Sequence, residues 1–170
     1  MKDFVNQLSG GDLRSIGKSN SVASLIVNQQ DFDELFKLIF HDERLIVMRA
    51  IDAIEKITIK HPNYLSKHKN EILNLSTVAL DKELKWHLAQ IIPRLSLTPH
   101  ELTKAWKLLT NWAMDKNNSR IVRVNSIQGL FEMLKDHNEL TQDFALTLTE
   151  LEQENIPSIN ARIRLLKNKI

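Results

Sequence analysis

Apolar residues recur at spacings of three and four along most of the chain, which is typical of amphipathic helices and not of strands. Four of these helical segments resemble one another, and they lie at residues 43–57, 81–95, 119–134 and 158–170. Equivalent positions in them are 38, 38 and 39 residues apart, from Val47 to Lys85, Arg123 and Arg162. A period near forty residues indicates a solenoid built from paired helices.

The aligned segments share three apolar columns. These columns are Ile46, Leu84, Val122 and Ala161; Met48, Trp86, Val124 and Ile163; and Ile51, Ala89, Ile127 and Leu166. Together they cover a wide arc of the helix surface. Such an arc suits a helix that packs both on its own partner and on the next repeat.

Each of these second helices follows a first helix, predicted at residues 31–40, 69–80, 101–114 and 140–154. Thr98 and Glu101 around Pro99 form the pattern of a capping box, and Asp31 with Glu34 predicts another helix start. We therefore predict four repeats at about residues 31–60, 63–95, 99–135 and 140–170, in one continuous domain. Residues 1–30 are predicted to form an N-terminal helical cap, with helices near 1–8 and 19–29 and a break at Gly10 and Gly11.

The segment 121–130 (IVRVNSIQGL) resembles the second helix of a HEAT repeat, which has an Asp at the preceding turn, then Val-Arg, then small and apolar residues. Leu84-Lys85 and Ala161-Arg162 resemble the Val-Arg pair, whereas Ile46-Val47 departs from it. Asp residues also end three successive first helices, at positions 42, 81 and 115. The resemblance covers residues 31–170. It implies an all-α fold, a short right-handed α-α superhelix of HEAT-like helical hairpins.

Charge is unevenly distributed between the two kinds of helix. Counted over residues 43–60, 82–94, 120–135 and 162–169, the second helices sum to +9. Counted over residues 31–37, 67–71, 101–115 and 139–154, the first helices sum to −6, although the whole chain carries only +2. The second helices of HEAT proteins line the concave face, so the resemblance implies a basic inner surface that attracts anions. We predict a partner-binding ridge there, formed by Lys82, Lys85, His87, Arg120, Arg123, Arg162, Arg164 and Lys167.

The basic column also has a structural interpretation. Lys85 and Arg123 could bond to the turn Asp residues of neighbouring repeats, since such ladders are structural in HEAT proteins. The cluster near the C-terminus has no following repeat to pair with, so this alternative is weaker for Arg162 and Arg164. Trp86 is open to two interpretations as well: it could stack on a nucleic-acid base, but its apolar column favours core packing.

The chain is predicted to be a non-catalytic scaffold or adaptor that binds an acidic protein partner. The alternative is a nucleic-acid-binding protein of the HEAT-like DNA glycosylase type, because residues 111–123 are similar to helix-turn-helix segments of those enzymes. No catalytic Asp between aromatic residues can be identified, and phosphate-loop and nucleophile-elbow motifs are missing. We therefore expect no enzyme activity and no small-molecule substrate.

Cofactors and membranes are not expected either. The six His residues are scattered and form no zinc-binding helix motif, and the absence of Cys excludes thiolate ligands, so no metal is predicted. No apolar run approaches the ~20 residues that a membrane helix needs. The N-terminal residues lack the apolar core of a signal peptide, and together with the lack of Cys this predicts a cytoplasmic location.

Overall fold

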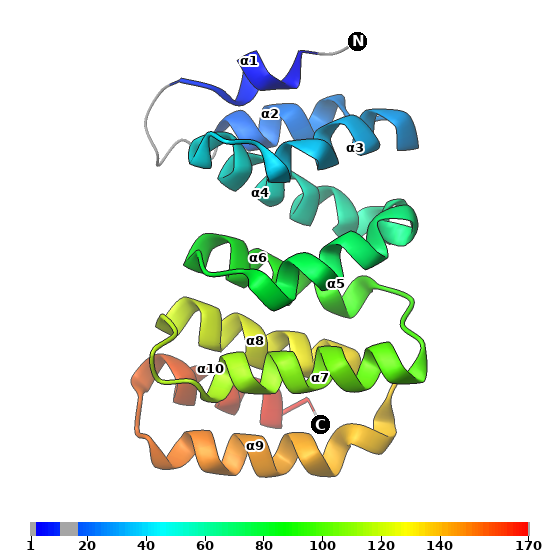
Figure 1. Ribbon diagram of the computed structural model, residues 1–170. Helices are drawn as coiled ribbons and strands as arrows, with labels where there is room; N and C mark the ends of the chain where they lie inside the picture. Colours follow the sequence, from blue (N-terminus) through cyan, green and yellow to red (C-terminus); the bar gives the residue numbers. More distant parts are fainter. Residues whose placement is uncertain (1–2, 11–16, 170) are drawn as a thin grey trace. The chain divides into compact units, whose positions relative to one another are not determined.

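The computed structural model describes residues 3–10 and 17–169 (Figure 1). Those residues form α-helices, short 3-10 segments and turns, and they contain no strand, so the all-α fold is confirmed. The chain packs into two compact units, an N-terminal unit of residues 1–68 and a C-terminal unit of residues 69–170. The prediction of one continuous domain stays a prediction.

The N-terminal unit is organised around its longest helix, α4. Its elements are α1 (Phe4–Leu8), α2 (Gly17–Leu25), α3 (Gln29–Phe36), a 3-10 segment (Lys37–Phe40), α4 (Arg44–Lys60) and a second 3-10 segment (Pro62–His68). Helix α4 contacts α1, α2 and α3. Phe32, Ile46 and Ile54 are completely buried in the core between them. The predicted cap thus contains two helices, and the predicted break is described only at Gly10, because Gly11 lies outside the described residues.

Two cations hold the C-terminal end of α1. Arg49 is buried, and its Nη1 atom donates hydrogen bonds to the carbonyl oxygens of Leu8 at 2.5 Å and Gly10 at 2.7 Å. Lys18 Nζ also donates to the Gly10 oxygen, at 2.9 Å. The last carbonyl groups of a helix have no partner within it, so cations there satisfy acceptors that would otherwise be unmet.

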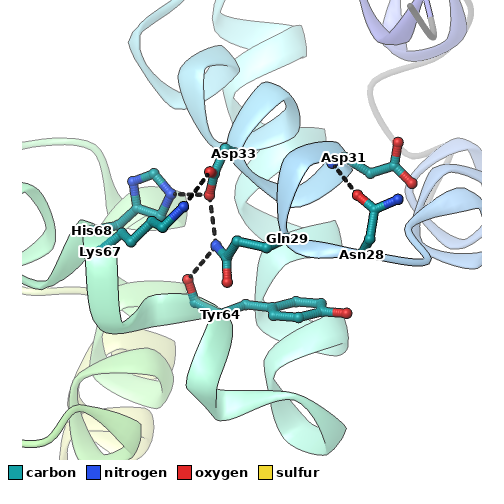
Figure 2. Close-up of polar contacts among 7 residues, drawn as sticks. All are labelled: Asn28, Gln29, Asp31, Asp33, Tyr64, Lys67 and His68. Atoms are coloured by element: carbon teal, nitrogen blue, oxygen red, sulfur yellow. Dashed lines mark hydrogen bonds and ion pairs between the residues drawn. The ribbon is translucent and has the colours of Figure 1, made fainter.

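One predicted helix start is wrong. Helix α3 begins at Gln29, and Asn28 is its N-cap, whose side chain accepts a hydrogen bond from the Asp31 backbone N–H at 2.9 Å (Figure 2). Asp31 therefore lies in the first turn, where an acidic side chain is favourable. The capping box at Thr98 is confirmed: Glu101 N–H donates to its hydroxyl at 3.4 Å, and its own N–H donates to the Glu101 carboxylate at 2.7 Å.

The C-terminal unit contains three pairs of helices. They are α5 (Lys69–Val78), α6 (Lys82–Ile91), α7 (Pro99–Met114), α8 (Arg120–Met133), α9 (Thr141–Gln153) and α10 (Pro157–Lys167), with 3-10 segments at Ile92–Arg94 and Asn138–Leu140. Helix α8 contacts α6 on one side and α10 on the other, and α7 packs across it. The second helices α6, α8 and α10 thus form one layer within this unit, and the first helices α7 and α9 lie in front of it in Figure 1.

The starts of the second helices reveal the register of the repeats. The N-cap residues are Glu43, Asp81, Ser119 and Ile156, which are 38, 38 and 37 residues apart. The last spacing corrects the sequence alignment, which placed the fourth copy two residues too late. Lys85 and Arg123 are each the fourth residue after their N-cap, whereas Arg162 is the sixth.

Burial supports the corrected register. Ile159, Ile163 and Leu166 are buried on α10. With the shorter spacing they align with Val122, Ser126 and Gly129 of α8, which are buried too. The sequence alignment instead placed Ala161 in the column of the buried Ile46 and Val122, yet Ala161 is only half-buried. The register of α10 is therefore set by its apolar residues and not by its basic ones.

Candidate functional site

The candidate site is the solvent-facing side of α6, α8 and α10, here called the second-helix surface. Counted from each N-cap, the fifth residues are Trp86, Val124 and Ala161, and the ninth are Gln90, Gln128 and Leu165. Leu165 is exposed and the other five are half-buried. Apolar and amide side chains therefore form the centre of this surface, and the predicted basic residues lie around or beneath them.

Arg123 is part of the internal structure. It is only 2% exposed. Its Nε atom donates to the Ala113 carbonyl oxygen at 2.6 Å, and Nη2 forms an ion pair with Glu154 Oε1 at 2.9 Å. The hydrogen bond from Arg123 holds the pKa of Glu154 below its ordinary value, although burial opposes this. This arrangement favours the structural alternative for Arg123: the guanidinium links α8 to the ends of α7 and α9.

Lys85 is half-buried beside the next repeat. Its Nζ atom donates to Asn118 Oδ1 at 3.0 Å and lies 5.8 Å from the centre of the Trp112 ring. Cations are attracted to the faces of aromatic rings at such distances. Neither neighbour carries a negative charge, so the charge of Lys85 stays uncompensated. In the structural alternative, a turn Asp would have neutralised this charge.

Three further predicted residues are paired or buried. Lys82 lies 3.8 Å from the Glu83 carboxylate and Lys167 lies 2.7 Å from that of Glu152. His87 was predicted to lie on the partner-binding ridge, but it is buried, and its ring meets the Trp86 ring edge-on with the centroids 4.8 Å apart. These three side chains are less available to a partner than the sequence suggested.

The remaining three predicted residues are arginines that keep their charge available. Arg120 and Arg164 are exposed and make no polar contact among the described residues. Arg162 Nη1 donates to Gln128 Oε1 at 2.5 Å, which is a neutral partner. No carboxylate among the described residues forms an ion pair, defined by a distance of at most 4.0 Å, with Lys85, Arg120, Arg162 or Arg164. We call these four residues the free cations.

The acidic residues of the same helices are compensated. Glu83 lies beside Lys82, and Glu132 forms an ion pair with Lys135 while accepting a hydrogen bond from Gln128 Nε2 at 2.6 Å. Helix α10 carries no acidic residue. The second-helix surface therefore has an excess of positive charge, and this excess comes from half of the residues predicted for it.

Comparison with known families identifies this architecture. The profile of the HEAT repeat domain matches residues 7–170. The chain belongs to the HEAT repeat family. No curated protein and no solved structure matches it. HEAT repeats are helical scaffolds for protein interactions in general, and HEAT repeat domains are typically non-catalytic.

The HEAT domain also contains a polar cluster that the sequence did not reveal (Figure 2). Asp33 Oδ1 accepts hydrogen bonds from Gln29 Nε2 at 2.6 Å and from His68 Nε2 at 2.8 Å, and Lys67 Nζ lies 3.4 Å from Oδ2. Burial raises the pKa of Asp33, but these hydrogen bonds and the Lys67 charge outweigh it, so the pKa is below its ordinary 3.8. The His68 ring stacks on Phe36, with centroids 3.8 Å apart. The cluster joins α3 to the segment 62–68 within the N-terminal unit.

The described part of this HEAT protein contains neither a metal-binding cluster nor a membrane-spanning helix. No group of three or more His, Asp or Glu residues there could hold a metal ion. No helix among residues 3–10 and 17–169 is long and apolar enough to cross a membrane.

Proposed function

We propose that this HEAT protein is a binding scaffold whose second-helix surface holds an acidic segment of another protein. One observation above all favours a negatively charged partner. The four free cations lie on α6, α8 and α10, and each acidic residue of these helices already has a cationic neighbour. An acidic segment can pair with the free cations without breaking an existing ion pair. Binding at Lys82 or Lys167 would first have to break one.

The positions of the free cations favour an extended partner. Lys85 bonds to Asn118, two residues before Arg120, so these two lie near the start of α8. Arg162 reaches α8 at Gln128 from the neighbouring helix, and Arg164 lies on the same α10. Since α6, α8 and α10 are stacked, a segment that crosses all three would meet cations along its whole path.

A protein partner suits this surface better than a nucleic acid. Nucleic-acid binders neutralise many phosphates, commonly about 6–10, with clustered Lys and Arg residues. Here the free cations surround apolar and amide side chains such as Trp86, Val124 and Gln90. Apolar residues with a polar, charged rim are characteristic of protein interfaces. HEAT repeats in general serve protein interactions, which agrees with this choice.

The proposal can be tested by selecting ligands without bias. A displayed library of random 12-residue peptides would be selected on the immobilised full-length protein, and the affinity of the recovered peptides would be measured in solution. We expect recovered sequences rich in Asp and Glu. The variant Arg120→Glu with Arg164→Glu should weaken their binding by about tenfold or more, because both side chains are exposed and free of internal contacts.

The matched control is Lys104→Glu with Lys107→Glu. Both lysines are exposed on α7, in the layer of first helices, and the control changes the net charge by the same amount. An equal loss in both double variants would mean that total charge, and not this surface, drives binding, and it would overturn the proposal. Recovery of neutral or basic peptides, or of none, would do the same.

The nucleic-acid alternative is decided in parallel with a 20-base-pair duplex and a 20-nucleotide single strand at low salt. Binding that falls with a log–log salt slope near −0.9 per phosphate contact would favour the alternative. The cytoplasmic location and the absence of catalysis stay predictions.

A further inference from the structure

We infer that Trp86 is the apolar anchor of the second-helix surface, against which the acidic segment packs one large apolar side chain. This inference rests on the proposed function and adds the specificity that the free cations cannot supply. Opposite charges attract many partners, whereas a hydrophobic contact at a fixed place selects a sequence. The segment would then carry an aromatic or large aliphatic residue between acidic ones.

The three tryptophans differ in how they are held. Trp106 and Trp112 are each 6% exposed. Trp106 Nε1 donates to Asp143 Oδ2 at 2.6 Å, and Trp112 lies beneath the Lys85 ammonium. Trp86 is half-buried, and its indole N–H has no hydrogen-bond acceptor in the described chain. Two of the rings are therefore fixed parts of the core, while the third is only half-buried and its buried indole N–H is held by no hydrogen bond.

The surroundings of Trp86 suit a peptide. Trp86 and Val124 occupy the same position after their N-caps on α6 and α8, and these helices are in direct contact, so the two side chains extend one apolar strip. One turn further along lie Gln90 and Gln128. The Gln128 amide already bonds to Arg162 and Glu132, and Gln90 Nε2 donates to the Trp86 carbonyl oxygen at 3.5 Å, so the Gln90 side-chain oxygen is the acceptor left for a peptide backbone N–H.

Two of the free cations lie next to this strip. Lys85 directly precedes Trp86 in α6, and Arg162 reaches the strip at Gln128. Acidic residues near the bound apolar side chain would therefore find a cation. This charge complementarity favours an acidic polypeptide segment as the occupant of the strip. A second copy of the chain does not fit, because its own second-helix surface carries the same excess of positive charge.

The test uses the acidic peptides recovered from the library. Trp86→Ala should weaken their binding about tenfold or more, and Trp86→Phe should keep it within about threefold, because a smaller aromatic ring preserves the contact. Leu146→Ala is the matched control: Leu146 is 60% exposed on α9, away from the second helices, and its removal should leave binding unchanged. Helical circular dichroism and melting would show that each variant is folded.

A second measurement uses the wild-type protein and needs no variant. Trp86 is the most exposed of the three tryptophans, so acrylamide should quench it most, and a bound peptide should protect the wild-type fluorescence from quenching. If peptides bind through Arg120 and Arg164 but quenching and the Trp86→Ala affinity are unchanged, the anchor is refuted and the proposed function stands. If no acidic peptide binds, both fail.

Discussion

Gly129 offers the sharpest test of how closely the second helices pack. It lies inside α8, where replacement of Gly by Ala normally stabilises a helix by about 1 kcal/mol. A Cβ atom at this position would lie 2.4 Å from the backbone oxygen of Ala89 in α6 and 3.2 Å from Leu109 Cδ1. We therefore expect Gly129→Ala to destabilise the C-terminal unit, against the intrinsic helix preference.

The expected loss of stability depends on which atoms have to move to make room for the new Cβ atom. An ordinary contact begins at 3.4 Å, so Ala89 and α8 would have to separate by about 1 Å. The obstructing atom belongs to the backbone of α6, whose neighbours Leu88 and Ile91 are completely buried. Overpacking of this kind costs about 1–3 kcal/mol and occasionally more, and the upper end applies because no side chain can rotate away. After subtraction of the helix preference, a net loss of about 2 kcal/mol remains.

The assay is urea unfolding followed by tryptophan fluorescence. All three tryptophans lie in residues 69–170, so their emission reports on the C-terminal unit. The control is Asn125→Ala, a half-buried position on the same helix, which should leave the free energy of unfolding nearly unchanged. A Gly129→Ala protein as stable as the wild type, or more stable, would refute the close approach of α6 and α8.

Two further predictions concern ion pairs. Arg123→Ala should lower the free energy of unfolding by about 3 kcal/mol, because it removes the cation that pairs with the Glu154 carboxylate, whose side chain is only 13% exposed. Replacement of the exposed Arg164 by Ala should change the free energy of unfolding by less than about 0.5 kcal/mol. Urea titrations of the two variants compare these values, and equal effects would contradict the buried ion pair. Hydrogen bonds from Lys69 and from the Thr98 backbone lower the pKa of Glu101 from 4.5 to about 2. The ionised Glu101 carboxylate therefore stabilises the fold above pH 4.5, and this stabilisation is lost as the pH falls toward 2. Glu101→Gln should flatten the pH dependence of the free energy of unfolding between these two pH values, and an unchanged slope would contradict the lowered pKa.

The fold could be predicted because it repeats. Apolar columns spaced by one repeat length can be found in the sequence, since each second helix needs the same wide apolar arc. The ten helices of the described chain fall where the pattern placed them, apart from helix ends such as the start of α3. Asn28 competed there with Asp31 for the same N-cap role, and the two side chains are nearly equal as caps.

The site could be predicted only in part, because the sequence gives the charge of each helix but not the direction in which each side chain points. Lys85 and Arg123 occupy one column, yet Lys85 meets the neutral Asn118 and Arg123 meets Glu154. The sequence separates such partners by about thirty residues and gives no sign of which pairs meet. The Asp33 cluster was missed for the same reason: Gln29 is one helical turn from Asp33, but His68 is 35 residues away.

The corrected register explains why positive charge remains free on the last helix. The eighth residue after the N-cap is Ala89 in α6, Ile127 in α8 and Arg164 in α10. Ala89 lies against Gly129 of the following second helix, and Ala89 and Ile127 are completely buried, so this position faces along the stack. A helix that packed on α10 as α8 packs on α6 would bury the Arg164 charge without a partner, which is strongly unfavourable. The arginine that stands where α6 has Ala89 and α8 has Ile127 is exposed on α10, and an acidic segment can reach its guanidinium there.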